Sequence, residues 1–142
     1  MMMKQFLIFI TFILVAQLGL TEESKSEMMN DFGGKSGLIK VVDDFMIGLL
    51  AEPKTKESFV NTDQKHIKEQ LVEQFCELMD GGCKYSGKSM AKAHSGLDIK
   101  RGEFNALVEC LQTAMTKHSV PVRSQNKLLS LLAPMHKDII RK

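Results

Sequence analysis

The chain has 142 residues, of which 44% are hydrophobic, and this length and composition indicate one globular domain with a core of its own. The net charge is only +2 and the lysines are spread along the chain, which argues against nucleic-acid binding. Ten methionines offset a low aromatic content of 6%, and their adaptable side chains suit an apolar ligand pocket as well as a core.

The N-terminus differs in composition from the rest of the chain. Lys4 precedes an apolar run from Phe6 to Val15, which is too short to span a membrane comfortably and is typical of a secretory signal. We therefore expect residues 1–20 to be a signal peptide and the protein to be exported, to a periplasm. An uncleaved segment that anchors the chain to a membrane is the alternative. Residues 21–30 are expected to be a polar, mobile segment, and 31–142 the folded domain.

The first helix is predicted after a turn at Asp31–Gly34. Its apolar face is formed by Leu38, Val42, Phe45 and Leu49, spaced by four, three and four residues. Pro53 ends this pattern, because the residue before a proline is pushed out of the helical region. The stretch Lys54–Val60 is expected to be a short connection that holds Phe59.

Three further helices follow in the pattern. Thr62 and Asp63 are suitable N-caps for a helix that runs to about Met79. The next helix begins near Lys100, and its apolar repeat consists of Phe104, Leu107, Val108, Leu111 and Met115. In the last helix Pro134 should bend the backbone or leave a carbonyl unpaired. No useful alternation of period two is present, so the fold class is all-α.

The segment between the second and third of these helices carries a distinctive order of residues. That order is Gly81-Gly82, Tyr85, Met90, His94 and Gly96. It resembles the proximal region of group 1 truncated haemoglobins. Further matching motifs are Gly33-Gly34, Phe45, Phe59 with Asn61-Thr62, and Leu132-Ala133-Pro134-Met135. The resemblance covers Asp31 to Ile140 and implies a two-over-two helical sandwich around a haem.

The resemblance also implies a cofactor site. It predicts one non-covalent haem b, with His94 binding the iron through a neutral imidazole nitrogen and the opposite side left for a diatomic gas, O2, NO or CO. Phe59 is expected to stack against the haem. The further wall residues are expected to be Phe75, Met90, Ile99 and Phe104. Tyr85, Lys68 and Lys92 are candidates for contact with the haem propionates.

The distal side departs from the family pattern. Family members commonly place a tyrosine and glutamines where this chain has Met46, Ile67 and Leu71. Gln70 and Gln74 lie beside this face, and helix geometry is expected to direct them elsewhere. A hydrogen bond to bound O2 contributes about 1.5–3 kcal/mol, so an apolar distal side predicts weak O2 binding or fast O2 release. It also predicts less discrimination against CO and NO.

These residues support a gas-binding globin for oxygen transport, storage or sensing. The alternative is a haem enzyme, such as an NO dioxygenase or a peroxidase-like protein, which needs an electron donor that the sequence does not identify. The chain has no G-x-G-x-x-G motif that would supply a flavin or nicotinamide. A helical interaction module without a cofactor would leave the glycine pairs, Phe59 and the His94 segment unexplained.

The remaining cysteines and histidines are expected to be structural. Cys76, Cys83 and Cys110 match no zinc spacing and no C-x-x-C-H motif for covalent haem. One pair could bridge in an oxidising compartment, but the sequence does not choose the pair, and thiols without chemistry are the favoured interpretation. No partner spacing marks His66, His118 or His136 as metal ligands.

Overall fold

The computed structural model describes residues 27–140, and they form helices and loops without a strand. The expected signal peptide therefore lies outside the described residues. A short helical segment at residues 27–31 comes first. The elements that follow are α2 (Gly34–Ala51), α3 (Pro53–Phe59), α4 (Gln64–Leu78), α5 (Met90–Ala93), α6 (Arg101–Lys117), α7 (Val122–Leu132), the 3₁₀ helix η1 (Ala133–Met135) and α8 (His136–Ile139). None of the helices within this part of the chain is long and apolar enough to cross a membrane.

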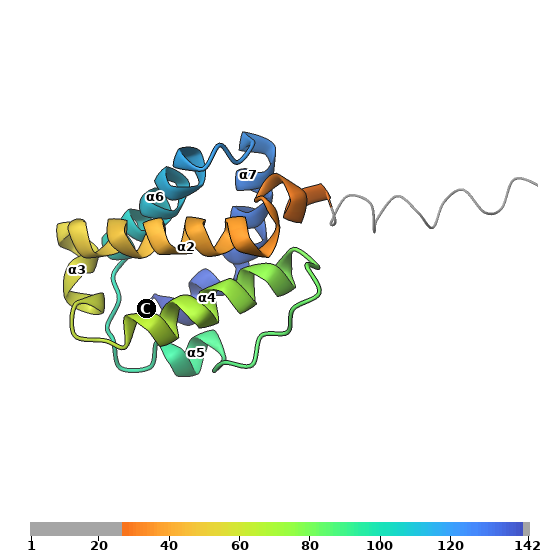
Figure 1. The fold of residues 1–142 in the computed structure, drawn as a ribbon. Helices are drawn as coiled ribbons and strands as arrows, with labels where there is room; N and C mark the ends of the chain where they lie inside the picture. Colours follow the sequence, from red (N-terminus) through yellow and green to blue (C-terminus); the bar gives the residue numbers. More distant parts are fainter. Residues whose placement is uncertain (1–26, 141–142) are drawn as a thin grey trace, which may run out of the picture.

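The long helices form two pairs that pack on each other (Figure 1). α2 packs against α4 in the first pair, and α6 packs against α7 in the second. Contacts between α2 and α6 and between α4 and α7 join the pairs. In the view of Figure 1, α5 lies on the side of α4 away from α2. The all-α, two-over-two arrangement expected from the sequence is confirmed.

α2 is the central helix of the core. Its expected apolar face is fully buried, and the residues on it are Leu38, Val42, Phe45 and Leu49. Val41, beside that face, is buried as well, because α2 is covered by both α4 and α6. Burying a large aliphatic or aromatic side chain contributes about 1.5–3 kcal/mol, so this helix supplies much of the stability of the domain.

The start of α2 shows why glycines occupy its N-cap and its first position. Gly33 and Gly34 have φ angles of 77° and 68°, a left-handed backbone that side chains with a Cβ adopt at a cost. They link α2 to the segment 27–31, in which Met28 and Met29 are 6% and 8% exposed. The packed domain thus begins by residue 27, before the expected boundary at Asp31.

The structure differs from the sequence prediction at α3, where a connection was expected and a helix of 7 residues is present. Pro53 not only ends α2 but occupies the first turn of α3, where its missing N–H costs nothing. The Glu52 side chain caps this helix by accepting a hydrogen bond from the Lys54 amide at 3.1 Å. Thr55 then donates to the Leu49 carbonyl at 2.8 Å, which fastens α3 to the end of α2.

The expected effect of Pro134 is confirmed. α7 ends at Leu132, and the proline lies in η1, after which the chain resumes as the short α8. α8 packs against α5. The break therefore brings the end of the described chain to the segment that carries His94.

Candidate functional site

His94 stands at the end of α5, a helix of only four residues. Ser89 starts this helix, because its hydroxyl accepts a hydrogen bond from the Lys92 amide. The His94 imidazole is half-buried, and its Nδ1 lies 2.8 Å from the carbonyl oxygen of Met90. A carbonyl can only accept, so Nδ1 carries the hydrogen and Nε2 has a free lone pair in the neutral ring.

This tautomer is the one that an iron ligand needs. The hydrogen bond to Met90 fixes the orientation of the ring. Because this bond uses Nδ1, Nε2 is the ring nitrogen that can bind a metal. The donor atom is therefore oriented and available.

The apolar residues predicted for the site fall into two groups. Met46 and Phe75 are 3% and 2% exposed and belong to the buried interior. The others are only half-buried: Phe59, Ile67, Leu71, Met90, Ile99 and Phe104. They come from α3, α4, α5, α6 and the loop before α6. Part of each of these apolar side chains is accessible to solvent, and a flat apolar group could cover this accessible surface. Together with the free Nε2, this residue set fits a haem.

A pocket of about 360 Å³ adjoins His94 and includes Ile99. Its other walls come from the start of α5 and from the end of the described chain, including Ala91, Asp138 and Ile139. α8 therefore shapes the surroundings of the imidazole. This contribution could not be predicted from local sequence patterns, because it depends on the change of direction at Pro134.

Gln70 and Gln74 of α4 have different surroundings. The Gln70 Nε2 lies 3.5 Å from Glu73, and its Oε1 is buried without a hydrogen-bond partner. Gln74 is 8% exposed, and its Nε2 lies 3.5 Å from the Met90 Sδ and 3.6 Å from the Met135 Sδ. Gln74 thus points into the interior, toward Met90 and Met135, whereas Gln70 points toward the loop that precedes α5.

The position of Gln74 could have been found from spacing alone. Ile67, Leu71 and Gln74 are separated by four and three residues and share one face of α4. An amide on an otherwise apolar face is a signal in its own right, because a buried amide needs partners. Here the partners are two thioether sulfurs, which are weak acceptors.

The residues proposed for propionate contacts have protein partners in the structure. The Tyr85 hydroxyl donates to the Lys88 carbonyl at 2.7 Å, and burial, followed by the charge of Glu73, raises the pKa of this phenol. Lys68 pairs with Asp43 at 2.7 Å. These two side chains therefore act within the protein fold, and Lys92 lies exposed on α5.

The other histidines lie on elements other than α5. His66 is exposed at the start of α4, and the His136 ring packs edge-on against Phe104 at 4.9 Å. His118 ends α6 and contacts Asp44 at 2.6 Å. Within residues 27–140, no group of three or more His, Cys, Asp or Glu side chains could hold a metal ion.

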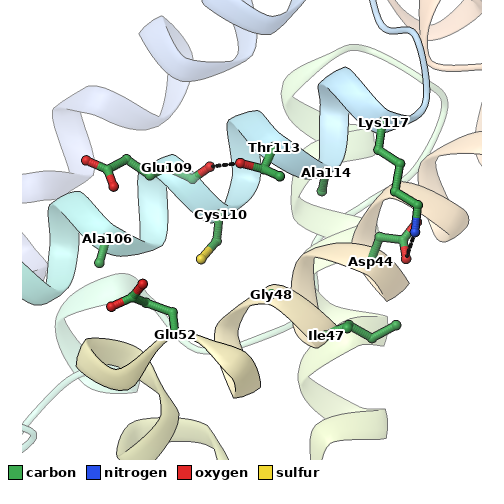
Figure 2. A pocket seen from close by; sticks show the side chains of 10 residues that line it. All are labelled: Asp44, Ile47, Gly48, Glu52, Ala106, Glu109, Cys110, Thr113, Ala114 and Lys117. Carbon is green, nitrogen blue, oxygen red and sulfur yellow. Dashed lines mark hydrogen bonds and ion pairs between the residues drawn. The ribbon is translucent and has the colours of Figure 1, made fainter.

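A second pocket, of about 310 Å³, lies between α2 and α6 and contains none of the predicted site residues (Figure 2). Cys110 faces it as a free thiol. Burial raises the pKa of this thiol, and the charges of Glu52 and Glu109 raise it further. A raised pKa lowers the fraction of reactive thiolate at neutral pH.

The other two cysteines correct the expectation that all three are thiols without chemistry. Cys76, near the end of α4, forms a disulfide with Cys83, and their Cα atoms are 5.6 Å apart. The turn at Gly81-Gly82 reverses the chain, and this reversal brings the two residues together.

With this geometry in place, the relatives of the chain are informative. A family model for bacterial-like globins matches residues 27–141. The chain belongs to the bacterial-like globin family. As a globin it is a haem-binding protein, with a single non-covalent haem b.

Its relatives include group 1 truncated haemoglobins. The protein from Tetrahymena pyriformis is 28% identical over 110 residues, which cover 78% of this chain and 91% of the relative. GlbN from Mycolicibacterium paratuberculosis is 29% identical over 107 residues, which cover 75% and 79%. The resemblance found in the sequence is therefore confirmed.

Solved structures agree with this assignment. The crystal structure of the Tetrahymena pyriformis truncated haemoglobin in its Fe(III) form matches with a TM-score of 0.76 and 27% identity, over 81% of this chain and 98% of that one. The 2/2 haemoglobin from Synechococcus, at 20% identity and a TM-score of 0.74, covers the same shares of the two chains and supports the fold.

Proposed function

We propose that this globin binds a diatomic gas reversibly at a haem iron held by His94, with an apolar distal side. The observation that carries the proposal is the hydrogen bond from His94 Nδ1 to the Met90 carbonyl. It engages Nδ1 and orients the ring, so Nε2 is the nitrogen left to bind the iron, as required of a single proximal ligand.

A bound haem supplies a redox-active iron with a coordination position for a gas ligand. The protein then has three tasks. His94 offers a neutral nitrogen, so no negative charge on this ligand stabilises the ferric state. Phe59 and Phe104 offer apolar ring surface, and the half-buried Ile67 and Leu71 exclude water from the distal side.

The distal residues set the selectivity that we propose. Met46, Ile67 and Leu71 carry no hydrogen-bond donor in their side chains. Bound O2 carries partial negative charge and benefits from a donor, whereas CO does not depend on one to the same extent. We therefore propose fast O2 release and weak discrimination against CO and NO.

An absorption spectrum tests the proposal most directly. The purified full chain, with and without added haemin, is compared with His94→Ala and with His66→Ala as the control for an exposed histidine. We expect a Soret band with one haem per chain in the native protein and in His66→Ala, and its loss or a shift to another coordination state in His94→Ala. A folded, helical native protein that takes up no haem would refute the function, and an unchanged His94→Ala spectrum would refute the ligand.

Enzymatic NO dioxygenation is the competing function. It needs a stable O2 complex and an external electron donor, and the apolar distal side disfavours the first. Stopped-flow mixing of the oxygenated protein with NO separates the two functions. Stoichiometric nitrate formed in repeated cycles with a reductant would support the enzyme, and a single slow conversion would support gas binding.

We also propose that the chain is exported, as the apolar run from Phe6 to Val15 predicts. The disulfide between Cys76 and Cys83 supports this, because disulfides persist mainly in oxidising compartments. The N-terminal sequence of the protein recovered from cells provides the test. A mature chain that begins near residue 20 would agree, and an intact N-terminus in the cytoplasm would contradict export.

A further inference from the structure

The loop 83–89, which leads from the end of α4 to α5, is fastened along α4 at three successive positions. The first is covalent, since Cys76 on α4 is bonded to Cys83 at the start of the loop. In the second, Glu73 accepts hydrogen bonds from the Ser86 amide at 3.3 Å and from the Ser86 hydroxyl at 3.1 Å.

The third contact is steric. Gly87 packs so closely on the Gln70 side chain that a Cβ at this position would overlap the Gln70 Oε1. Gln70, Glu73 and Cys76 are spaced by three residues and form a stripe along α4. The loop runs antiparallel to that stripe and leaves it only shortly before Ser89.

The loop ends where α5 begins. Ser89 caps α5, and His94 follows four residues after Met90, the first residue of that helix. α5 has a single turn, which is too short to be stable alone, so its position depends on its attachments. These attachments include α8, the contact of Gln74 with Met90, and the loop that is bound to α4.

We propose that Cys76 and Cys83 form a reversible dithiol/disulfide site, and that its redox state controls how firmly the loop 83–89, and through it His94, retains the haem. This inference rests on the proposed function, because it takes His94 as the iron ligand. It adds a redox-sensitive site, whose reaction partner is a dithiol reductant.

The two sulfurs differ in accessibility, and this difference sets the direction of the reaction. Cys76 is completely buried, whereas Cys83 is half-buried. A thiolate of the reductant therefore attacks the Cys83 sulfur, the S–S bond breaks, and Cys76 leaves as a thiolate that takes up a proton. The second thiol of the reductant then resolves the mixed disulfide and releases Cys83 as a thiol. Two electrons and two protons pass from the dithiol to the pair.

Reduction should affect the loop more than α4. The Cys76 sulfur packs against Gly81 and near Met29, and a buried thiol behaves there as a small apolar group. Cys83 has no comparable burial to hold it. After reduction the loop keeps only the exposed hydrogen bonds to Glu73 and the Gly87 contact, so it opens more often.

The first measurement uses the full chain as Cys110→Ser, so that only one pair of cysteines is present. Mass spectrometry fixes the oxidised and dithiothreitol-reduced states, and the haem-loaded protein is mixed with an excess of an apo-globin that captures released haem. We expect haem transfer to be at least about fivefold faster in the reduced protein. Adding Cys83→Ser should reproduce the fast rate without reductant.

Hydrogen exchange of the loop amides is the second measurement, and it needs no haem. We expect faster exchange at residues 83–89 on reduction, with the α2 amides unchanged. Three results would overturn the inference: no disulfide in the oxidised protein, unchanged loop exchange, or equal haem transfer in the two states. A protein that takes up no haem would overturn the proposed function, and with it the haem part of this inference. Hydrogen exchange of the amides at residues 83–89, compared between the oxidised and the reduced protein, then shows separately whether the redox site exists.

Discussion

Replacing Met46 by tyrosine adds a hydroxyl donor to the apolar distal side. Met46 is 3% exposed on α2, which packs directly on α4. The neighbouring amides do not compensate for its lack of a donor, because Gln70 is directed to Glu73 and Gln74 to two methionine sulfurs. The native distal side should therefore offer bound O2 no hydrogen bond from these side chains.

The size of the effect follows from the strength of one such bond. A hydrogen bond to a charged or partly charged acceptor contributes about 1.5–3 kcal/mol. Since about 1.4 kcal/mol corresponds to a factor of ten, Met46→Tyr should slow O2 dissociation roughly ten- to a hundredfold. CO dissociation should change far less, because CO carries little negative charge on its outer atom.

Stopped-flow measurement of O2 dissociation checks this, with Met46→Phe as the matched control. Phenylalanine brings the ring without the hydroxyl, so the ratio between the two variants isolates the hydrogen bond from the change in packing. The reasoning fails if native O2 release is already as slow as in Met46→Tyr. It also fails if Met46→Phe slows release to the same extent.

Two further predictions concern the framework of the site. Thr55→Val should lower the free energy of unfolding by about 1–3 kcal/mol, because the buried Leu49 carbonyl loses its donor; urea unfolding measures this, and Thr55→Ser should retain most of the stability. Hydrogen bonds from Lys117 and then His118 lower the pKa of Asp44, so the stability that this carboxylate contributes is present above its unfolded pKa of about 4 and is lost as the pH falls through the lower folded pKa. Asp44→Asn should therefore weaken the loss of stability in acid, and an unchanged unfolding curve between neutral and acid pH would contradict the role of this pair.

The long helices could be predicted from the sequence because a helix that is buried on one face has apolar residues every three or four positions. The face of α2 that includes Leu38 and Phe45 is buried as the spacing requires. The capping of α4 was also predictable, since the Asp63 side chain accepts from the His66 amide at 3.0 Å. Such local signals need no knowledge of the partner helix.

Features that depend on distant contacts could not be predicted in the same way. The choice of Cys83 as the partner of Cys76 depends on how the turn at Gly81-Gly82 reverses the chain. The direction of Gln74 depends on Met90 and Met135, which approach it from other elements. For Gln74 the helical spacing held a usable signal, and for the cysteines the sequence held none that selects the pair.

The two shortest helices have a consequence for how the cofactor site is completed. α5 and α8 have four residues each and pack on one another beside His94. Neither is long enough to persist in isolation, so each provides the surface on which the other is ordered. The side of the site that carries the proposed iron ligand is thus built from two helices that depend on each other. We therefore expect haem binding at the proposed site to be coupled to the folding of these two helices, with haem completing the fold.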